Sequence, residues 1–204
     1  MLKIAVFVSG RGSNLQAILD AKSGGFLKSE VAAVFTDKPE SGAVEKAVRN
    51  SIPVRFLCRG KKPGWVSDEE LAGVLEELKV DLVVLAGYLK LVPVSIIELY
   101  ENRIINIHPA LLPSFGGKGM YGMNVHRAVF NSSAKVSGPT VHFVDKVYDN
   151  GKIIAQKAVD ISDVRSPEEI AEKVLKLEHE LLPLVIRKFE EGKIKIIDER
   201  VVVF

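Results

Sequence analysis

The sequence predicts an α/β fold, with a doubly wound, mostly parallel sheet and helices on both faces. Short apolar runs rich in β-branched residues recur through the first half, and amphipathic stretches of helical period separate them. A parallel crossover needs a dozen or more residues and normally uses a helix, so this alternation favours parallel strands. The second half instead holds two strand-like runs that predict an antiparallel hairpin.

The first half is expected to alternate strands with helices. Helical patterns stand between and after the strand-like runs, and each is long enough to cross from one parallel strand to the next. The expected strands are residues 3–8, 31–35, 54–57, 81–86 and 103–107. The expected helices are residues 15–22, 42–50, 67–79 and 94–102.

The second half has a different pattern. After a Pro- and Gly-rich loop, we expect a short helix near 122–131 and then strands within 138–148 and 152–161, joined through Asp149-Asn150-Gly151. Asn-Gly between two strand-like runs is a strong hairpin signal. A long helix should start at about Ser166, an N-cap followed by proline and two acids, with Pro183 as a candidate kink. A weak strand at 193–197 and three valines follow.

The composition limits the possible partners. The chain has 28 basic and 26 acidic residues, so its net charge of +2 provides no broad attraction for nucleic acid or an anionic membrane. Its one cysteine, Cys58, excludes an internal disulfide and favours a reducing compartment. The first apolar run is too short for a membrane span or a signal peptide. We therefore expect a cytoplasmic protein without nucleic-acid or membrane partners.

A glycine-containing turn, SGRGSN at 9–14, follows the first expected strand and opens the first helix. Helix N-termini bind phosphate through free N–H groups and the helix dipole. Gly10 and Gly12 would let the backbone approach the anion, while Ser13 and Asn14 would add side-chain donors and an N-cap. The alternative is a capped turn without a ligand.

The same turn also partly matches a dinucleotide-binding fingerprint. Gly10 and Gly12 are followed by Asp37 at the end of the second strand, where such folds place an acid. Leu15 occupies the place of the third glycine. We therefore predict a site for one phosphate, and keep a dinucleotide-dependent oxidoreductase and a non-catalytic phosphate-binding module as alternatives.

A polar pair, Asn106 and His108, ends the fifth expected strand just before a Pro-rich bend. Ligands of doubly wound sheets collect beyond the carboxyl ends of strands, and alternate residues of a strand share a side. An amide and an imidazole side by side can donate two hydrogen bonds to a developing oxyanion. Asp149 is a candidate partner that would favour the charged imidazole. A hydrogen-bonded strand end and an ordinary turn aspartate are the alternatives.

The other histidines have structural interpretations. His126 is expected in the short helix, His142 on a strand face and His179 in the long helix. None forms the close spacing of histidines and acids that a metal site needs. We therefore predict no metal.

Four stretches together resemble one family. They are SGRGSNLQAIL (9–19), VVLAGYLKLV (83–92), INIHPALLPSF (105–115) and SGPTVHFV with YDNG (137–151). In this order, over nearly the whole chain, they are similar to the folate-dependent formyltransferases. The pattern N-x-H-P-x-L-L-P is specific to that wider group, and the early SGRGSN loop is similar to its phosphoribosylglycinamide branch.

The resemblance implies that a formyl group passes from 10-formyltetrahydrofolate to the primary amine of glycinamide ribonucleotide. The amine would attack the formyl carbon directly, and a tetrahedral oxyanion would form. The resemblance makes Asn106, His108 and Asp149 catalytic, with His108 as the acid. The substrate-binding residues would be Gly12, Ser13, Asn14 and Glu178. The residues in contact with the reduced folate would be Leu89, Lys90, Leu91, Val92, Asn106, Val144, Asp145 and Val147, and the backbone of 144–148 would hold the pterin.

The resemblance also implies one formyltransferase domain over 1–204, with a phosphate-binding half at 1–100 and a catalytic and folate-binding half at 101–204. We expect a monomer or homodimer. The related methionyl-tRNA formyltransferases and formyltetrahydrofolate hydrolases carry additional domains, for which this chain is expected to have no room. Residues 116–125 form a longer segment than in better-known members. Lys61, Lys62 and Lys90 are the candidates for meeting the glutamate tail of the folate.

Overall fold

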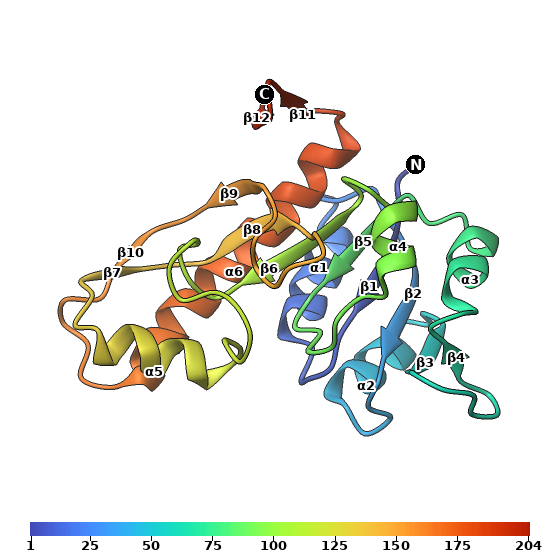
Figure 1. Cartoon of the computed structure of the whole chain (residues 1–204), viewed down its shortest axis with the longest axis horizontal. Coiled ribbons are helices and arrows are strands. Elements are labelled where there is room, and N and C mark those ends of the chain that lie inside the picture. The colour runs from blue at the N-terminus through green and yellow to red at the C-terminus, as the bar shows by residue number, and fades with distance from the viewer. The chain divides into compact units, whose positions relative to one another are not determined.

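The computed structural model describes residues 1–204, which divide into two compact units, Met1–Ile105 and Asn106–Phe204 (Figure 1). The expected α/β class is confirmed, because helices alternate with parallel strands in the first unit and an antiparallel pair lies in the second. The interpretation of the whole chain as one domain stays a prediction.

The first unit is built from alternating strands and helices, as expected. Each predicted strand and helix is present, with ends shifted by a few residues. One short strand, β4, was not predicted. The elements are β1 (Lys3–Phe7), α1 (Ser13–Ser23), β2 (Glu30–Thr36), α2 (Gly42–Arg49), β3 (Val54–Cys58), β4 (Val66–Ser67), α3 (Leu71–Glu77), β5 (Leu82–Leu85), α4 (Val94–Leu99) and the start of β6 (Ile104–His108).

The strand order of the first unit reverses beside β1. The order is β4-β3-β2-β1-β5, and β1 pairs in parallel with both β2 and β5. Parallel crossovers are almost always right-handed. The helices of the crossovers that run from β1 towards β3 therefore lie on the opposite face from the helix of the crossover that returns to β5. In agreement, α1 packs with α2, and α3 packs with α4. The carboxyl ends of β1 and β5 therefore flank a topological switch point, where ligands of such sheets bind.

The strands at the centre of this unit are apolar because both of their faces are covered by helices. Every residue of β5 is buried, as are the last four of β1. The rings of Phe7 and Phe35 stack across neighbouring strands, with centroids 4.7 Å apart. These contacts fix the strand ends from which the first-unit loops emerge.

The second unit contains the remaining elements. Its sheet has the order β6-β8-β9, with β8 and β9 antiparallel, and two small antiparallel pairs, β7 with β10 and β11 with β12. The elements are α5 (Met123–Asn131), β7 (Val136–Ser137), β8 (Thr140–Phe143), β9 (Ile153–Gln156), β10 (Val159–Asp160), α6 (Pro167–Glu190), β11 (Ile194–Ile197) and β12 (Arg200–Val203).

The long helix α6 begins as its sequence indicates. The hydroxyl of Ser166 accepts a hydrogen bond from the N–H of Glu169 (3.3 Å), and Pro167 occupies the first helical position. The helix continues through Pro183 to Glu190. It packs against α5 around a buried apolar cluster that comprises Ala110, Val125, Val129, Ile161, Ile170 and Val174.

The predicted antiparallel hairpin is confirmed, but its connection is longer than the predicted Asp149-Asn150-Gly151. β8 ends at Phe143 and β9 begins at Ile153, so residues 144–152 connect them. The loop has its own hydrogen bonds, because the carboxylate of Asp145 accepts from the N–H of Val147 (2.8 Å) and from the amide of Asn150 (2.9 Å). The sequence signal identified the connected strands but not the length of the loop.

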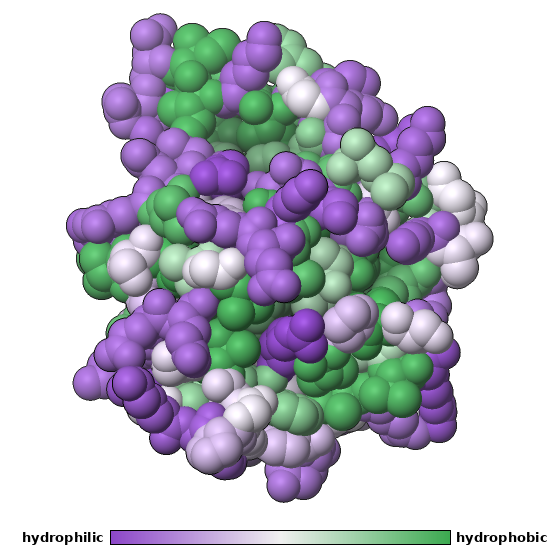
Figure 2. Space-filling model, turned by 90° about the vertical axis from the view of Figure 1, so that its right-hand side faces the viewer, coloured by the Kyte–Doolittle hydropathy of each residue, from purple (hydrophilic) through white to green (hydrophobic).

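The surface on the side of α3 and β4 is mixed in polarity. Hydrophilic side chains cover much of the face in Figure 2, between smaller groups of hydrophobic ones. None of the helices has the length and apolar character needed to cross a membrane.

Candidate active site

The turn after β1 leads directly into α1. Gly12 is the N-cap residue, with φ of 71°, and no side chain caps this helix end. The expectation that Ser13 or Asn14 provides the N-cap is therefore wrong: both lie inside α1, because the chain enters the helix through a left-handed glycine. The first-turn N–H groups of a helix have no intrahelical acceptor, so this end retains the features of an anion site.

Two glycines allow this turn to approach α2 closely. A β-carbon on Gly12 would lie 2.9 Å from the Cα of Ala43, and one on Gly42 would lie 2.9 Å from the carbonyl oxygen of Arg11. Real β-carbons essentially never come this close to backbone atoms. Both glycines are therefore required by packing, and Gly12 also by its positive φ.

Ser9 connects three loops of the first unit. Its hydroxyl donates to the carboxylate of Asp37 (2.6 Å) and accepts from the N–H of Leu89 (3.0 Å), while its own N–H donates to the carbonyl of Gly87 (3.0 Å). These bonds join the segments that follow β1, β2 and β5. Asp37 thus holds a loop, which reduces the support for the dinucleotide interpretation, where that acid meets a ribose.

A cavity of about 220 Å³ opens beside these loops in the first unit. Basic, acidic and apolar side chains line it. They are Asp37, Leu57, Cys58, Arg59, Asp68, Tyr88, Lys90 and Leu91. Of the three lysines considered for the folate tail, only Lys90 lines this cavity, whereas the ammonium of Lys62 lies 3.4 Å from the ring centre of Trp65.

In the second unit, Asn106 is held by a histidine that the sequence interpretation did not select. The amide nitrogen of Asn106 lies 3.1 Å from Nε2 of His142, and Nδ1 of His142 lies 2.7 Å from the carbonyl oxygen of Phe143. A carbonyl can only accept, so Nδ1 carries a proton, and in the neutral form of the ring Nε2 accepts from the amide. His142 therefore orients Asn106, whose second N–H can serve as a donor.

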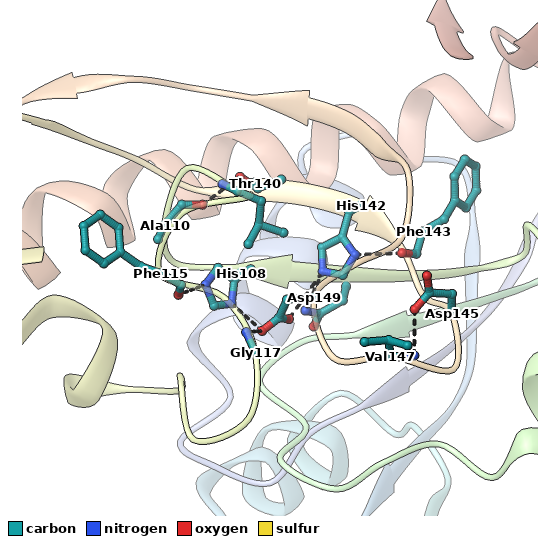
Figure 3. A network of polar contacts seen from close by, with 12 residues as sticks. His108, Ala110, Phe115, Gly117, Thr140, His142, Phe143, Asp145, Val147 and Asp149 are labelled. Atoms are coloured by element: carbon teal, nitrogen blue, oxygen red, sulfur yellow. Dashed lines mark hydrogen bonds and ion pairs between the residues drawn. The ribbon is translucent and has the colours of Figure 1, made fainter. Parts of the chain in front are cut away.

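His108 is almost completely buried, with 3% of its surface exposed. Its Nε2 lies 2.9 Å from the carbonyl oxygen of Phe115, and its Nδ1 lies 3.6 Å from Oδ2 of Asp149 (Figure 3). Burial lowers the pKa of His108, and this outweighs the Asp149 carboxylate and the Phe115 carbonyl, which favour the charged ring. Burial thus opposes the effect of Asp149 on His108, and the expectation that Asp149 keeps the ring charged stays a prediction.

Asp149 lies between the two imidazoles (Figure 3). Its Oδ1 is 3.7 Å from Nε2 of His142, and its Oδ2 accepts from the N–H of Gly117 (2.9 Å). Burial acts to raise the pKa of Asp149, but the neighbouring imidazoles and the Gly117 N–H outweigh it and leave the pKa below its usual value. The carboxylate is therefore charged at neutral pH, and the predicted trio of Asn106, His108 and Asp149 comes together.

The Pro-rich bend after β6 is held by Thr140, which is fully buried. Its hydroxyl donates to the carbonyl of Ala110 (2.6 Å) and accepts from the N–H of Leu112 (3.0 Å). The amide of Gln156 donates to the carbonyl of Leu112 (2.9 Å). The strands β8 and β9 thus fix the segment that follows His108.

Thr140 and His142 carried a signal that sequence reasoning could have used. They are two polar residues at alternate positions of one short apolar strand, and alternate positions share a face. Both are buried, and buried polar groups are almost always hydrogen-bonded. Two such groups on one strand face indicate a polar network.

The other predicted binding residues lie in two places. In the first unit, Leu89 and Leu91 are exposed apolar side chains, and Val92 is buried. In the second unit, Val144, Asp145 and Val147 lie in the loop between β8 and β9, while Glu178 is buried on α6 with 8% exposed. The carboxylate of Asp145 is used to shape this loop, so a folate contact there would involve the backbone.

Substitution of Gly12 tests the anion site. We expect Gly12→Ala to raise the KM of a phosphate-bearing substrate about tenfold or more, because a left-handed alanine costs roughly 1–2 kcal/mol and its Cβ would press on Ala43. The control is Gly73→Ala, at a helical glycine whose Cβ would meet no atom within 4 Å. Steady-state kinetics measures both variants, and equal KM values would place the phosphate elsewhere.

Comparison with known proteins agrees with this arrangement. The formyl transferase family matches residues 2–186. A chloroplastic phosphoribosylglycinamide formyltransferase of Arabidopsis thaliana is 47% identical over 195 residues, covering 95% of this chain and 67% of that protein. The phosphoribosylglycinamide formyltransferase of Haemophilus influenzae is 35% identical over 199 residues, covering 97% and 92%.

A solved structure gives the same result. Glycinamide ribonucleotide transformylase 1 of Symbiobacterium toebii has a TM-score of 0.90 and 38% identity, covering 100% of this chain and 94% of that one. The resemblance found in the four sequence stretches is thereby confirmed. Because the family match extends over most of both units, the chain belongs to the formyl transferase family.

Proposed function

We propose that this protein transfers a formyl group from 10-formyltetrahydrofolate to the primary amine of glycinamide ribonucleotide, a step of de novo purine biosynthesis. The names of the similar proteins support formyl transfer to phosphoribosylglycinamide, and the formyl donor is what the family resemblance implies. The observation that carries the proposal is the cluster of Asn106, His108 and Asp149 within one unit. An oriented amide, a buried imidazole and a carboxylate are what direct formyl transfer needs around one carbon.

In the proposed reaction, the amine nitrogen attacks the formyl carbon, and the carbonyl electrons move onto oxygen. Asn106 donates a hydrogen bond to this oxyanion. His108 is neutral in the free protein, so it can accept the proton that the amine loses. The resulting imidazolium stabilises the oxyanion and passes the proton to the folate nitrogen as the carbon–nitrogen bond to the folate breaks. Asp149, charged and close to the ring, favours the imidazolium while it exists.

The two substrates have separate proposed contacts. The turn of Gly12, with Ser13 and Asn14 in the first turn of α1, would bind the ribonucleotide phosphate, and Glu178 would bind its ribose. The exposed Leu89 and Leu91, together with Lys90 and Val92, would line the folate site in the first unit. Asn106 and the backbone of Val144, Asp145 and Val147 would contact the pterin.

Lys90 is the proposed partner of the glutamate tail. It lines the first-unit cavity together with Arg59, a cation that the sequence interpretation did not consider. Lys61 and Lys62 do not line it, and Lys62 lies against Trp65. Two cations at one cavity suit a ligand with carboxylates, because charge-assisted hydrogen bonds are stronger than neutral ones.

We expect Lys90→Ala to raise the KM of the formylated folate about tenfold, since a hydrogen bond to a charged group contributes roughly 1.5–3 kcal/mol. The KM of the ribonucleotide should change little. The matched control is Lys62→Ala, which removes an exposed lysine outside the cavity. If the control raised the KM of the folate and Lys90→Ala did not, the tail would lie along residues 61–65 instead.

The function is tested with purified protein, 10-formyltetrahydrofolate and glycinamide ribonucleotide. The absorbance of the released folate and the mass of the formylated ribonucleotide measure the two products separately. We expect the released folate and the formylated ribonucleotide to form in equal amounts, and neither product to form when the ribonucleotide is omitted. Release of folate without the ribonucleotide would show a hydrolase, and saturable binding of NADH or NADPH without binding of a folate analogue would favour an oxidoreductase.

Three further expectations belong to this proposal. We infer a cytoplasmic location from the single cysteine, which suits a reducing compartment, and fractionation of cells would test it. The number of chains in the assembly, one or two, is measured by sedimentation equilibrium.

Activity that survives treatment with a chelator would support the prediction that no metal takes part.

A further inference from the structure

The turn at residues 115–117 contacts both groups that the proposed reaction uses for proton transfer. The carbonyl of Phe115 accepts from Nε2 of His108, and the N–H of Gly117 donates to Oδ2 of Asp149 (Figure 3). The bonds are both 2.9 Å long and come from the backbone of one three-residue segment. Such bonds do not depend on side-chain rotamers, so the conformation of the turn sets the positions of both groups.

The conformation of this turn is unusual and is held by packing. Phe115 has φ of 57°, a left-handed value that a bulky residue rarely adopts. Strain of this kind persists only where the surroundings maintain it, and it is concentrated at functional sites. Here the ring of Phe115 packs against the apolar cluster around α5 and α6. The ring therefore anchors the residue while its carbonyl points to His108.

Gly116 connects the two bonds, and a side chain there would displace its neighbours. A β-carbon there would lie 2.6 Å from Cδ2 of Leu112 and 3.0 Å from Cβ of Asp149. Its φ is not positive, so alanine would meet a contact rather than a forbidden backbone angle. The requirement for glycine thus arises partly from the close approach of the turn to Asp149 itself.

We propose that Phe115–Gly117 is a backbone clamp that selects Nδ1 of His108 as the nitrogen that exchanges protons with the substrates, with Gly116 as its positioning residue. The carbonyl of Phe115 only accepts, so it requires a proton on Nε2. The neutral ring then presents an unprotonated Nδ1 on the side of Asp149. The distance of 3.6 Å between Nδ1 and Oδ2 exceeds a hydrogen bond, which leaves Nδ1 able to take and return a proton. This inference rests on the roles proposed above for His108 and Asp149.

The charges around His108 agree with this assignment. Asp149 faces it from the loop after β8, His142 from β8, and His126 from α5. Burial and His142 disfavour the charged ring, while Asp149 and the Phe115 carbonyl favour it. The clamp therefore offsets part of the cost of burying the His108 ring. It supplies an acceptor for Nε2–H in both protonation states of His108 without adding a charge.

The tautomer of His108 is observable directly. In protein labelled with ¹⁵N at histidine, two-bond couplings from the ring nitrogens to the carbon-bound ring protons distinguish the Nε2–H from the Nδ1–H form, and the comparison with His108→Gln assigns the signals. We expect the neutral ring to be Nε2–H in the protein without ligands. An Nδ1–H form, or rapid exchange between both forms, would overturn the clamp whether or not the protein transfers formyl groups.

Gly116→Ala tests the positioning role. We expect kcat to fall about 10²-fold, as for a misplacement of about 1 Å near reacting atoms, with the KM of each substrate within about twofold. The tautomer preference of His108 should be lost, and the acidic limb of the kcat profile should move. The matched control is Gly119→Ala in the same loop, where φ is 87° but a β-carbon would meet nothing within 4 Å. It carries backbone strain without the contact and should keep both the tautomer and the pH profile.

The outcomes separate this inference from the proposed function. The wild type could show no formyl transfer but an Nε2–H tautomer of His108 that only Gly116→Ala changes. This result would support the clamp and show that the protein catalyses another reaction. If formyl transfer occurs but Gly116→Ala keeps the tautomer, the pH profile and kcat, the clamp fails and the function stands. An equal effect of Gly119→Ala on the tautomer of His108 would also contradict the clamp, because general strain in the loop would then explain the change.

Discussion

Asn106→Ala and His108→Ala are each expected to lower kcat by roughly 10²–10³-fold, with little change in the KM of the ribonucleotide. Loss of one donor to an oxyanion typically costs about 3–4 kcal/mol of transition-state stabilisation. Interactions made only in the transition state change kcat and kcat/KM together, without weakening substrate binding. His108 should have the larger effect, because the same ring also carries the proton from the amine to the leaving nitrogen.

Single-turnover and steady-state assays with both substrates measure these effects. Asn131→Ala is the matched control, because Asn131 is an exposed residue at the end of α5 in the same unit. It should leave kcat unchanged. Turnover close to wild type in either Asn106→Ala or His108→Ala would exclude that residue from the reaction. A large rise in KM with unchanged kcat would instead assign it to substrate binding.

The pH dependence of the wild type provides a second readout of His108. The free protein must hold the ring neutral to accept the amine proton, so kcat/KM is expected to fall as the pH drops through the pKa of His108. Burial places that pKa below the usual 6.5, so the fall should occur below pH 6.5. A profile that rises towards acidic pH would show that the charged ring is the active form.

Acid should destabilise the fold through His126, and His126→Leu is expected to remove a large part of this effect. His126 is 5% exposed, its Nδ1 has no hydrogen-bond partner, and burial lowers its pKa to about 4. The nearby His108 contributes to this lowering of the pKa. Because the unfolded chain binds the proton with a pKa near 6.5, it takes up protons at a higher pH than the folded chain.

The sign follows from this proton balance. Above pH 6.5 both states of His126 are neutral, and it contributes no pH dependence. Below pH 6.5 the unfolded state gains the proton first, so the free energy of unfolding falls as the pH drops towards 4. At about 1.4 kcal/mol for each unit of pKa, His126 alone accounts for a loss of about 3 kcal/mol.

Urea unfolding at several pH values between 4 and 7 measures this loss. His126→Leu and His126→Gln should both lack it, although their stabilities at pH 7 will differ because leucine and glutamine pack differently. The leucine variant should be little weakened at pH 7, since it removes a buried polar atom that has no partner. If both variants kept the full pH dependence of the wild type, the titrating group would be another one.

The elements of the first unit could be predicted from the sequence because each one depends on the pattern of its own residues. A buried parallel strand requires a continuous apolar run, and a crossover helix requires an amphipathic one. The strands β1, β2, β3 and β5 and their helices can therefore be predicted from the residue pattern. β4 has only two residues and therefore leaves almost no pattern. The Asn-Gly signal identified the hairpin but not the length of its loop, because the hydrogen bonds of Asp145 stabilise a longer loop, which a dipeptide rule does not consider.

The site was predictable in its residues but not in its electrostatics. The sequence by itself determined the family and indicated Asn106, His108 and Asp149 as the candidate site, because residue types in fixed order are typical of a family. Only the tertiary structure decided that His142 contacts Asn106, that burial lowers the pKa of His108 and that residues 115–117 contact both His108 and Asp149. These properties depend on desolvation and on backbone groups brought together from distant segments. Neither can be predicted from the order of the residues alone.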